Sequence, residues 1–526
     1  MRSARLACVS FALFGVISSH AQADVVGRML AIADDQPGGT PPPPAQSPDL
    51  TAWAGEARAT TLAELLQISV QQAPALQSAR LDIAVAEARI EETWVRNDWL
   101  LQAKLTGSRS GDSRFGVSTS IGGSADVSHL LTTGGTVALH VDSTYSKTSG
   151  SFGGFLDGNS WVNNLDASIT QPLLKGRGRD LFEANERRAV LARDVTVLAR
   201  RLVAIQAVQA VISAYWDLVL AERTVAITEQ SLDLARERLR VTQIGADGGK
   251  TPRSEIPAVL QIIATREEDV LNGELGVLNN SIALRRATGM PIGAGELGLR
   301  VATDLDTKDE PLDLGPLIER AFAASPELAE LAKEGDSATI DIAVTENGLL
   351  PQLDAALSLG PTGSDFSTTG PPRTDASFAT SLANLAKFNA LVINGSLTFS
   401  RSLDQHDVRG RAREQRELRR KLTVNEVDLR AQIAQTMARA VAQVELARRR
   451  VALSQRAIDL ANENIKIETD RFNLGKSTNF DVLNRLEDLR QAELRKAQAL
   501  IDWHKGETAV QALTGDLLPL YGIVLE

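Results

Sequence analysis

The sequence is short of cysteine, of aromatic residues and of basic charge. Of its 526 residues one is cysteine, 4% are aromatic, and 56 Lys and Arg stand against 66 Asp and Glu, which gives a formal net charge of −10. Without a basic excess the chain is not expected to bind nucleic acid, since phosphate backbones are bound by clustered positive charge. Few aromatics argue against a thick globular core. Small and aliphatic side chains in long helices fit this composition better.

The single cysteine, Cys8, lies in a segment typical of a secretion signal. Arg2 and Arg5 form a positive start, an apolar stretch follows, and residues 21–23 (Ala-Gln-Ala) make a small-x-small cleavage pattern. We therefore expect a signal peptide over residues 1–23, with lipid attachment at Cys8 as the less favoured alternative. Cleavage removes the only cysteine, which excludes disulfides, thiol catalysis and cysteine-bound metals from the mature chain.

A leader without core-forming composition follows the signal. Residues 24–59 contain a run of four prolines and a Pro-Gly-Gly stretch, which predicts a flexible leader. Ordered sequence is expected from Thr60. No later stretch approaches the ~18 uninterrupted apolar residues of a membrane-spanning helix, so any membrane role must use strands or a surface helix.

From Thr60 onward the sequence indicates two copies of one unit. A pattern of apolar positions ending in a Pro-x-Leu motif occurs twice, as Leu62, Leu65, Leu66, Val70, Pro74 and Leu76 and again as Leu314, Leu317, Ile318, Phe322, Pro326 and Leu328. We predict a first structural repeat over 60–310 and a second over 311–526, each in the order helix, strands, long helix, short helix. The two prolines should end a short first helix in each copy.

Long helices dominate both predicted repeats. After second helices at about 74–97 and 326–347, two stretches run without proline and almost without glycine, from about Gly178 to Ile244 and from about Gln405 to Leu474. Each would be on the order of 100 Å long. Shorter helices are expected at about 253–289 and 479–514. Two stacked short helices would then flank one long helix along nearly its whole length.

The long helices carry two apolar rows each. In the second copy one heptad row runs through Ile433, Met437, Ala440, Val444, Ala447, Val451, Ser454, Ile458, Ala461 and Ile465, and another through Leu446, Leu453, Leu460 and Ile467. The rows lie on roughly opposite sides of the helix. A dimeric coiled coil needs one row, whereas a helix with neighbours on both sides needs two. A ring of helices and an ordinary bundle both meet that requirement.

Between the helices, apolar and polar residues alternate. The alternation predicts half-apolar strands at 101–106, 137–141 and 165–169 in the first copy and at 353–359 and 391–400 in the second. Segments rich in Gly, Ser and Thr at 107–135, 146–160 and 360–377 are expected to be loops, although 117–146 is also compatible with an additional hairpin. A soluble sheet with one wet face and a membrane barrel with a polar lumen both explain the alternation.

Three segments resemble the TolC-like outer membrane efflux family. They are Arg471 to Leu483 (RFNLGKSTNFDVL), Ser325 to Leu328 (SPEL) and Gln171 to Gly176 (QPLLKG). The resemblance implies a mainly α fold with β strands, internally duplicated: a homotrimeric channel-tunnel with a twelve-stranded barrel in the outer-membrane lipid and a twelve-helix periplasmic tunnel. It further implies a passive duct without cofactor or enzymatic activity, working with a periplasmic adaptor and an inner-membrane transporter in efflux or type I secretion.

The resemblance also implies a gated periplasmic entrance at the helix turns. Asp481 matches an acidic position that rings the entrance, Asn484 replaces a second acid, and Phe472 replaces a tethering aromatic that carries a hydroxyl. Ser477 lies in the same turn, Ser254 and Glu255 are the corresponding first-copy residues, and Gly245 and Gly475 mark the turns an adaptor would meet. Asp481 also fits a simpler role, as a helix N-terminal charge favoured by the dipole.

Two other interpretations remain at this stage. A secreted structural coiled coil, such as an adhesin stalk or envelope spacer, explains the helices but not strands at matching positions of both copies. An enzyme gains little support, because the histidines at 129, 140, 406 and 504 are dispersed and lack metal-binding spacing. Basic residues gather where each copy leaves the strands, at 175–188 and 409–421, where lipid phosphates or solvent are the alternative neighbours.

Overall fold

The structure is a computed structural model. It describes residues 59–112, 116–150, 157–249, 251–293, 297–301, 312–368 and 374–525. The predicted signal peptide and the leader up to residue 58 lie outside the described residues.

The described chain alternates between helices and one sheet. Its first half comprises β1 (Ala59–Thr60), α3 (Leu62–Gln72), α4 (Pro74–Thr93), the 3-10 helix η1 (Trp94–Asn97), β2 (Leu100–Asp112), β3 (Gly116–Leu130), β4 (Thr136–Ser149), β5 (Gly158–Pro172), α5 (Arg179–Phe182), α6 (Ala184–Asp247), α7 (Glu255–Thr288) and β6 (Arg300–Val301). Its second half comprises α8 (Leu314–Ala324), α9 (Pro326–Asn347), β7 (Gln352–Phe366), α10 (Phe378–Ala386), β8 (Ala390–Ser400), α11 (His406–Asn473), α12 (Asn479–Thr514) and α13 (Leu517–Leu520).

The two prolines break the helices as the sequence predicts. Ala73 and Ser325 adopt extended backbone angles, and Pro74 and Pro326 open α4 and α9 at the position where a missing N–H costs nothing. Ser325 additionally caps α9, because its side chain accepts a hydrogen bond from the backbone N–H of Leu328. The predicted bounds of α9 and α12 are confirmed, as are those of the long helices to within a few residues.

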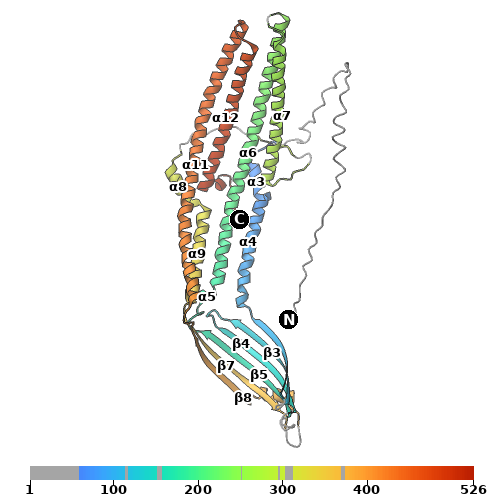
Figure 1. The fold of residues 1–526 in the computed structure, drawn as a ribbon, viewed down its shortest axis with the longest axis vertical. Helices are drawn as coiled ribbons and strands as arrows, with labels where there is room; N and C mark the ends of the chain where they lie inside the picture. The colour runs from blue at the N-terminus through green and yellow to red at the C-terminus, as the bar shows by residue number, and fades with distance from the viewer. Residues whose placement is uncertain are drawn as a thin grey trace, which may run out of the picture. The chain divides into compact units, whose positions relative to one another are not determined.

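The helices pack as long antiparallel pairs (Figure 1). α6 pairs with α7, α11 pairs with α12, and α6 also contacts α12, so the order across the helical part is α7, α6, α12, α11. On the side nearer the sheet, α4 and α9 pack against α6, and α9 also packs against α11. Buried Val208, Val211 and Leu218 of α6 lie at the centre of one apolar cluster, and Met437 of α11 in a second. Small and aliphatic residues therefore form most of the core, as the composition predicts.

One helix among the described residues, α6, contains a window apolar enough to cross a membrane by length and composition. The sequence prediction that no membrane-spanning helix follows the signal considers only uninterrupted apolar runs, and it therefore misses this window. Residues 204–219 of α6 include nine buried side chains of the first apolar cluster. Packing against the other helices thus accounts for part of the apolar character of this segment, since 28% of the window is buried within the single chain.

A six-stranded antiparallel sheet continues from one end of the helices, in the order β2-β3-β4-β5-β7-β8 (Figure 1). The expected loop over 107–135 is wrong, because most of it forms the paired ends of β2 and β3, joined to β4 by a turn at Leu131–Gly135. The additional hairpin, left open by the sequence, is present. The chain therefore supplies six strands to the sheet instead of the four that a twelve-stranded trimeric barrel requires.

The register gives the sheet one apolar face and one polar face. The apolar face is the side of the sheet that carries Leu101, Leu105, Ile121, Val127, Val137, Leu139, Val141, Leu165, Ala167, Ile169, Leu357, Leu359, Ile393 and Leu397. The polar face carries Gln102, Lys104, Asp126, His140, Asp142, Asn164, Asp166, Ser168, Asp354, Asn394 and Thr398. Leu105, Leu139 and Ile169 of the apolar face are exposed in the single chain.

Candidate functional site

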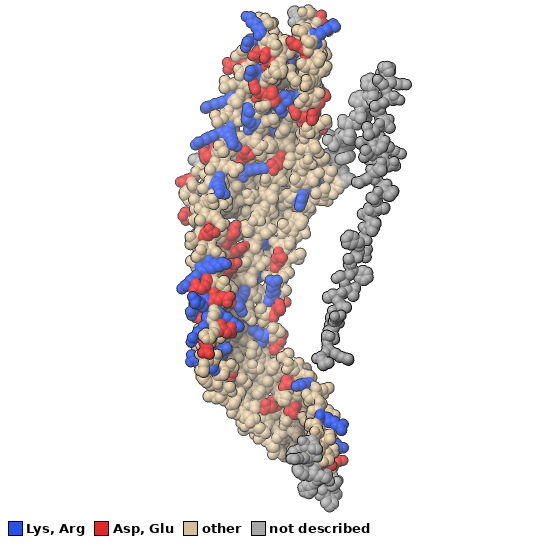
Figure 2. All heavy atoms as spheres, in the orientation of Figure 1, with Lys and Arg blue, Asp and Glu red and all other residues tan. Residues whose placement is uncertain are grey.

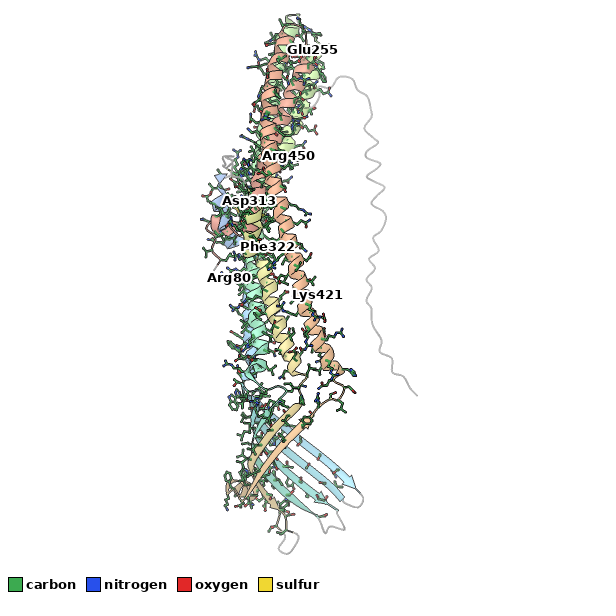
Figure 3. The ribbon with its side chains drawn as sticks, turned by 90° about the vertical axis from the view of Figure 1, so that its left-hand side faces the viewer. Arg80, Glu255, Asp313, Phe322, Lys421 and Arg450 are labelled. Carbon is green, nitrogen blue, oxygen red and sulfur yellow. The ribbon has the colours of Figure 1, made fainter. Side chains whose placement is uncertain are left out.

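The two helix turns implicated by the sequence lie together at the end of the helices opposite the sheet, where Figure 3 labels Glu255. The first turn follows Asp247 of α6 and contains Gly249 at φ +68°, and the second follows Asn473 of α11 and contains Gly475 at φ +70°. Both glycines supply the left-handed backbone that closes a tight reversal. Gly245 instead lies inside α6, where an added Cβ would sit 2.6 Å from the Thr251 hydroxyl.

Asp481 is held by its own helix terminus. Its Oδ2 atom accepts hydrogen bonds from the Thr478 backbone N–H at 3.1 Å, the Thr478 hydroxyl at 2.7 Å and the Ser477 hydroxyl at 3.3 Å. The Asp481 backbone N–H in turn donates to the Thr478 hydroxyl oxygen, which completes a capping box at the start of α12. The bond from the Thr478 side chain is the main reason that the pKa of Asp481 lies below its usual value. The carboxylate is therefore charged and fixed at the tip of the helix.

Phe472 forms a contact across the helices that needs no hydroxyl. The guanidinium carbon of Arg238, on α6, lies 3.9 Å from the centre of the Phe472 ring, on α11. Arg238 is 8% exposed, so the cation sits over the aromatic face largely out of water, where such contacts are strongest. The tie joins the end of the first long helix to the end of the second. No local sequence signal marks Arg238 for this role.

A second tie joins the two short helices at the same end. Asn479 of α12 is buried and donates through its side-chain amide to the Glu255 carboxylate of α7 at 2.5 Å. The pKa of Arg238 lies below its usual value because the guanidinium is buried, and the nearby Glu255 charge opposes this shift. The two ties therefore share one electrostatic environment. Ser254 is exposed and begins α7 without a side-chain cap. Asn484 is exposed on the first turns of α12.

Farther from the tip, an ion-pair network links α7 to α12. Arg266 pairs with Asp269 at 3.0 Å and with Glu487, and Arg490 pairs with Glu487 at 2.8 Å. Burial raises the pKa of Glu487, but the bonds from Arg490 and Gln491 and the charges of Arg490 and Arg266 outweigh it and lower the pKa to about 2. The sequence does not predict this network, because its members lie on different helices.

Half of the basic residues at 175–188 and 409–421, near the sheet, form ion pairs with acids. Figure 2 shows Lys and Arg gathered with Asp and Glu over the part of the helices adjoining the sheet. Arg188 pairs with Asp341 at 2.5 Å, Arg416 with Glu346 at 2.6 Å and Arg411 with Asp407 at 3.0 Å. These pairs favour the solvated-face interpretation over lipid phosphate binding. Within the described ranges, no group of three or more His, Cys, Asp or Glu side chains is arranged to hold a metal ion.

Comparisons with known proteins agree with this architecture. Residues 317–516 match the family model of the outer membrane efflux protein. No curated protein matches the chain. Among solved structures, the outer-membrane channel OprN is 14% identical with a TM-score of 0.61 over 86% of this chain and 90% of its own. The CusC structure is 13% identical with a TM-score of 0.63, over 92% and 98%.

The open-state MtrE outer membrane channel of Neisseria gonorrhoeae is similar to the same extent, at 16% identity and a TM-score of 0.60, over 87% of this chain and 89% of its own. At these identities the solved structures support the fold. The family match over residues 317–516 agrees with the relationship predicted from the sequence.

Proposed function

We propose that this chain is an outer membrane efflux protein, as the family match over residues 317–516 indicates, and that three copies assemble into one channel-tunnel that serves as the exit duct of an efflux or type I secretion system. The duct is passive. A periplasmic adaptor and an inner-membrane transporter would supply and select its cargo.

The main support for this assembly is an apolar row on α11 that no other helix of the single chain covers. On α11, the inward row is buried at Met437, Val444 and Ala447, whereas the second row is exposed by 50–62%. That second row consists of Leu446, Leu453, Leu460 and Ile467. An aliphatic row repeated at heptad spacing is the usual seam of a helix–helix contact.

A neighbouring copy covers this row in the proposed ring. α11 is one edge of the helix order and α7 is the other, and α7 exposes Leu260, Leu271 and Leu275. If α11 of one copy packs against α7 of the next, the contact is head-to-tail and closes into a ring. Three copies, the number that the family resemblance implies, place twelve helices around the tunnel at the level of α6, α7, α11 and α12.

The sheet supports the same closure. Its edge strands β2 and β8 are each paired on one side, and its exposed apolar face suits lipid whereas its polar face suits a watery lumen. Joining β8 of one copy to β2 of the next gives eighteen strands, and at ~4.8 Å per strand and ~40° tilt the barrel is about 36 Å across between backbones. Twelve strands would give about 24 Å.

Matching elements in the two halves support the proposed internal duplication. α3 and α8 each have 11 residues, both are followed by a helix that opens on proline, and both halves then run through strands into a helix pair. The proposed duplication explains why the ties at the entrance join equivalent helix ends.

The helix turns form the closed entrance of the proposed duct. The Arg238–Phe472 and Asn479–Glu255 contacts hold the two helix pairs of one copy together at the tip. Asp481 adds one carboxylate per copy near the opening and so favours cations. The alternative of a secreted structural coiled coil leaves the exposed apolar face of the sheet without an environment.

The test is assembly in the outer membrane followed by conductance. The full chain should fractionate with the outer membrane, migrate as a trimer on unheated gels and conduct ions in planar bilayers. Leu460→Glu should break the trimer, because it puts a charge into the exposed α11 row, whereas the control Asn462→Glu adds the same charge at an exposed position outside the row. A soluble monomer in the periplasm would refute the proposal.

A further inference from the structure

The short helix α10, Phe378–Ala386, packs against β5 and β7 of the sheet. Its Ser381 is fully buried, donates to the Gly363 carbonyl of β7 at 2.8 Å and accepts a 2.7 Å hydrogen bond from the Asn163 amide of β5. The rings of Phe378 and Trp161 meet edge to face with centroids 5.1 Å apart. Asn163, Gly363 and Trp161 all belong to the apolar face by register, so α10 covers part of that face.

The sheet is shaped to receive this helix. A Cβ on Gly363 would lie 2.2 Å from the Ser381 carbonyl oxygen, so only glycine lets the helix backbone approach this closely. The Asn163 side chain lies on the apolar face beside Ser143 of β4, and Ser381 satisfies its amide. The Asn384 amide also donates to the Ser364 carbonyl at 3.0 Å. The helix is therefore docked by specific contacts and is part of the fold.

The side of α10 that faces away from the sheet is apolar. Phe378, Ala379, Leu382, Ala383 and Ala386 are all exposed, with Phe378 at 43% and Leu382 at 46%. No charged residue lies between Phe378 and Ala386, while Asp375 and Lys387 flank the helix. A helix on a water-facing loop normally turns charged or polar residues outward. Here the outward residues continue the apolar face beneath them.

We propose that α10 is a lipid-facing helix, seated against the outside of the barrel in the membrane leaflet distal to the periplasm. This inference rests on the proposed barrel. The occupant of its exposed side is hydrocarbon, because that side is continuous with the apolar face, carries no charge and is apolar apart from Thr380.

The dimensions place the helix at the distal rim of the apolar band. β5 runs from Gly158, at the end away from the helices, to Pro172, next to them, and α10 contacts its distal end at Trp161 and Asn163. From Trp161 to Gln171 the strand covers about 34 Å, or about 26 Å across the membrane at ~40° tilt, close to the ~25 Å apolar band of outer-membrane barrels. Tyr145, whose ring lies 5.0 Å from that of Trp161, completes an aromatic cluster at this rim.

Spin labelling tests the inference, since the only cysteine is Cys8. In the full chain carrying Cys8→Ser, reconstituted into phospholipid vesicles, Leu382→Cys is labelled with a nitroxide and its collisions with oxygen and with a water-soluble nickel chelate are compared. The controls are Leu139→Cys on the apolar face and Ser168→Cys on the polar face. Ala386→Cys repeats the measurement should the first variant fold poorly.

We expect the labels at Leu382 and Leu139 to collide several-fold more with oxygen than with the chelate, and the label at Ser168 to do the reverse. A label at Leu382 that meets the chelate faces water, and one shielded from both reagents is covered by protein. Either result overturns the lipid-facing assignment while a lipid-exposed Leu139 leaves the barrel intact. A chelate-accessible Leu139 would instead overturn the proposed barrel itself.

Discussion

Arg238 on α6 stacks over Phe472 on α11, with 3.9 Å between the guanidinium carbon and the ring centre, and this contact ties the ends of two long helices opposite the sheet. Phe472→Leu removes the aromatic face but keeps most of the side-chain volume. This substitution should raise the open probability of the proposed channel about fivefold. A desolvated cation–π contact contributes about 1 to 2 kcal/mol, and the proposed closed state depends on it.

Single-channel recordings of Phe472→Leu, Arg238→Gln and the double variant measure this tie. The double variant should be no more open than either single variant, because each removes the same contact. Arg240→Gln is the matched control, since Arg240 is exposed and pairs with Glu237 at 2.6 Å on its own helix. Fully additive effects of the two substitutions would contradict the tie.

The charge of Asp481 should affect ion selectivity separately from its capping role. Asp481→Asn removes the charge and should reduce the preference for cations in reversal-potential measurements under a salt gradient. Thr478→Ala breaks the capping box, keeps the carboxylate and should lower the thermal stability while preserving selectivity. If Asp481→Asn left the reversal potential unchanged, the carboxylate would be a helix cap alone.

Acid should loosen the contact between α7 and α12. The folded pKa of Glu487 is about 2, below its ordinary value of 4.5, so its contribution to stability is complete above pH 4.5 and is lost as the pH falls toward 2. The melting temperature of the native chain should therefore fall more steeply across this range than that of Glu487→Gln. Asp488→Asn, at an exposed neighbour paired with Arg485, should keep the native slope.

Charge should be tolerated on one face of the sheet and not on the other. Leu139→Arg adds a charge to the apolar face and should cost about 2 to 4 kcal/mol if the residue faces the bilayer midplane, whereas Ala138→Arg, one residue earlier on the polar face, should cost little. The yield of unheated trimer in the outer-membrane fraction reports the difference. Equal yields would argue against lipid on the apolar face.

The sequence predicts the helices well because their signals are periodic and local. Pro74 and Pro326 fix the breaks, and the heptad rows fix the buried and exposed sides of α11, whose Leu453 is exposed as a second row requires. The sequence predicts β3 only as an alternative to a loop, because its small residues, Gly116 to Ser124, resemble a loop. Its backbone hydrogen bonds come from β2 and β4, which the local pattern does not reveal.

The candidate site was predictable only in part for the same reason. The turn around Asp481, which resembles a family motif, marks the position of the proposed entrance. Arg238 and Glu255 come from the first half of the chain and meet Phe472 and Asn479 only in the folded structure. α10 escaped notice because its docking depends on Gly363 and Asn163, which are distant strand residues.

The central claim is that three copies of a six-stranded sheet close into one barrel, and single-particle cryo-electron microscopy of the full chain in lipid nanodiscs tests it most directly. We expect a threefold particle whose barrel has eighteen strands, with β8 of each copy paired with β2 of the next and α11 packed against the neighbouring α7. A twelve-stranded barrel, an unpaired β2–β8 edge or a monomer would contradict it.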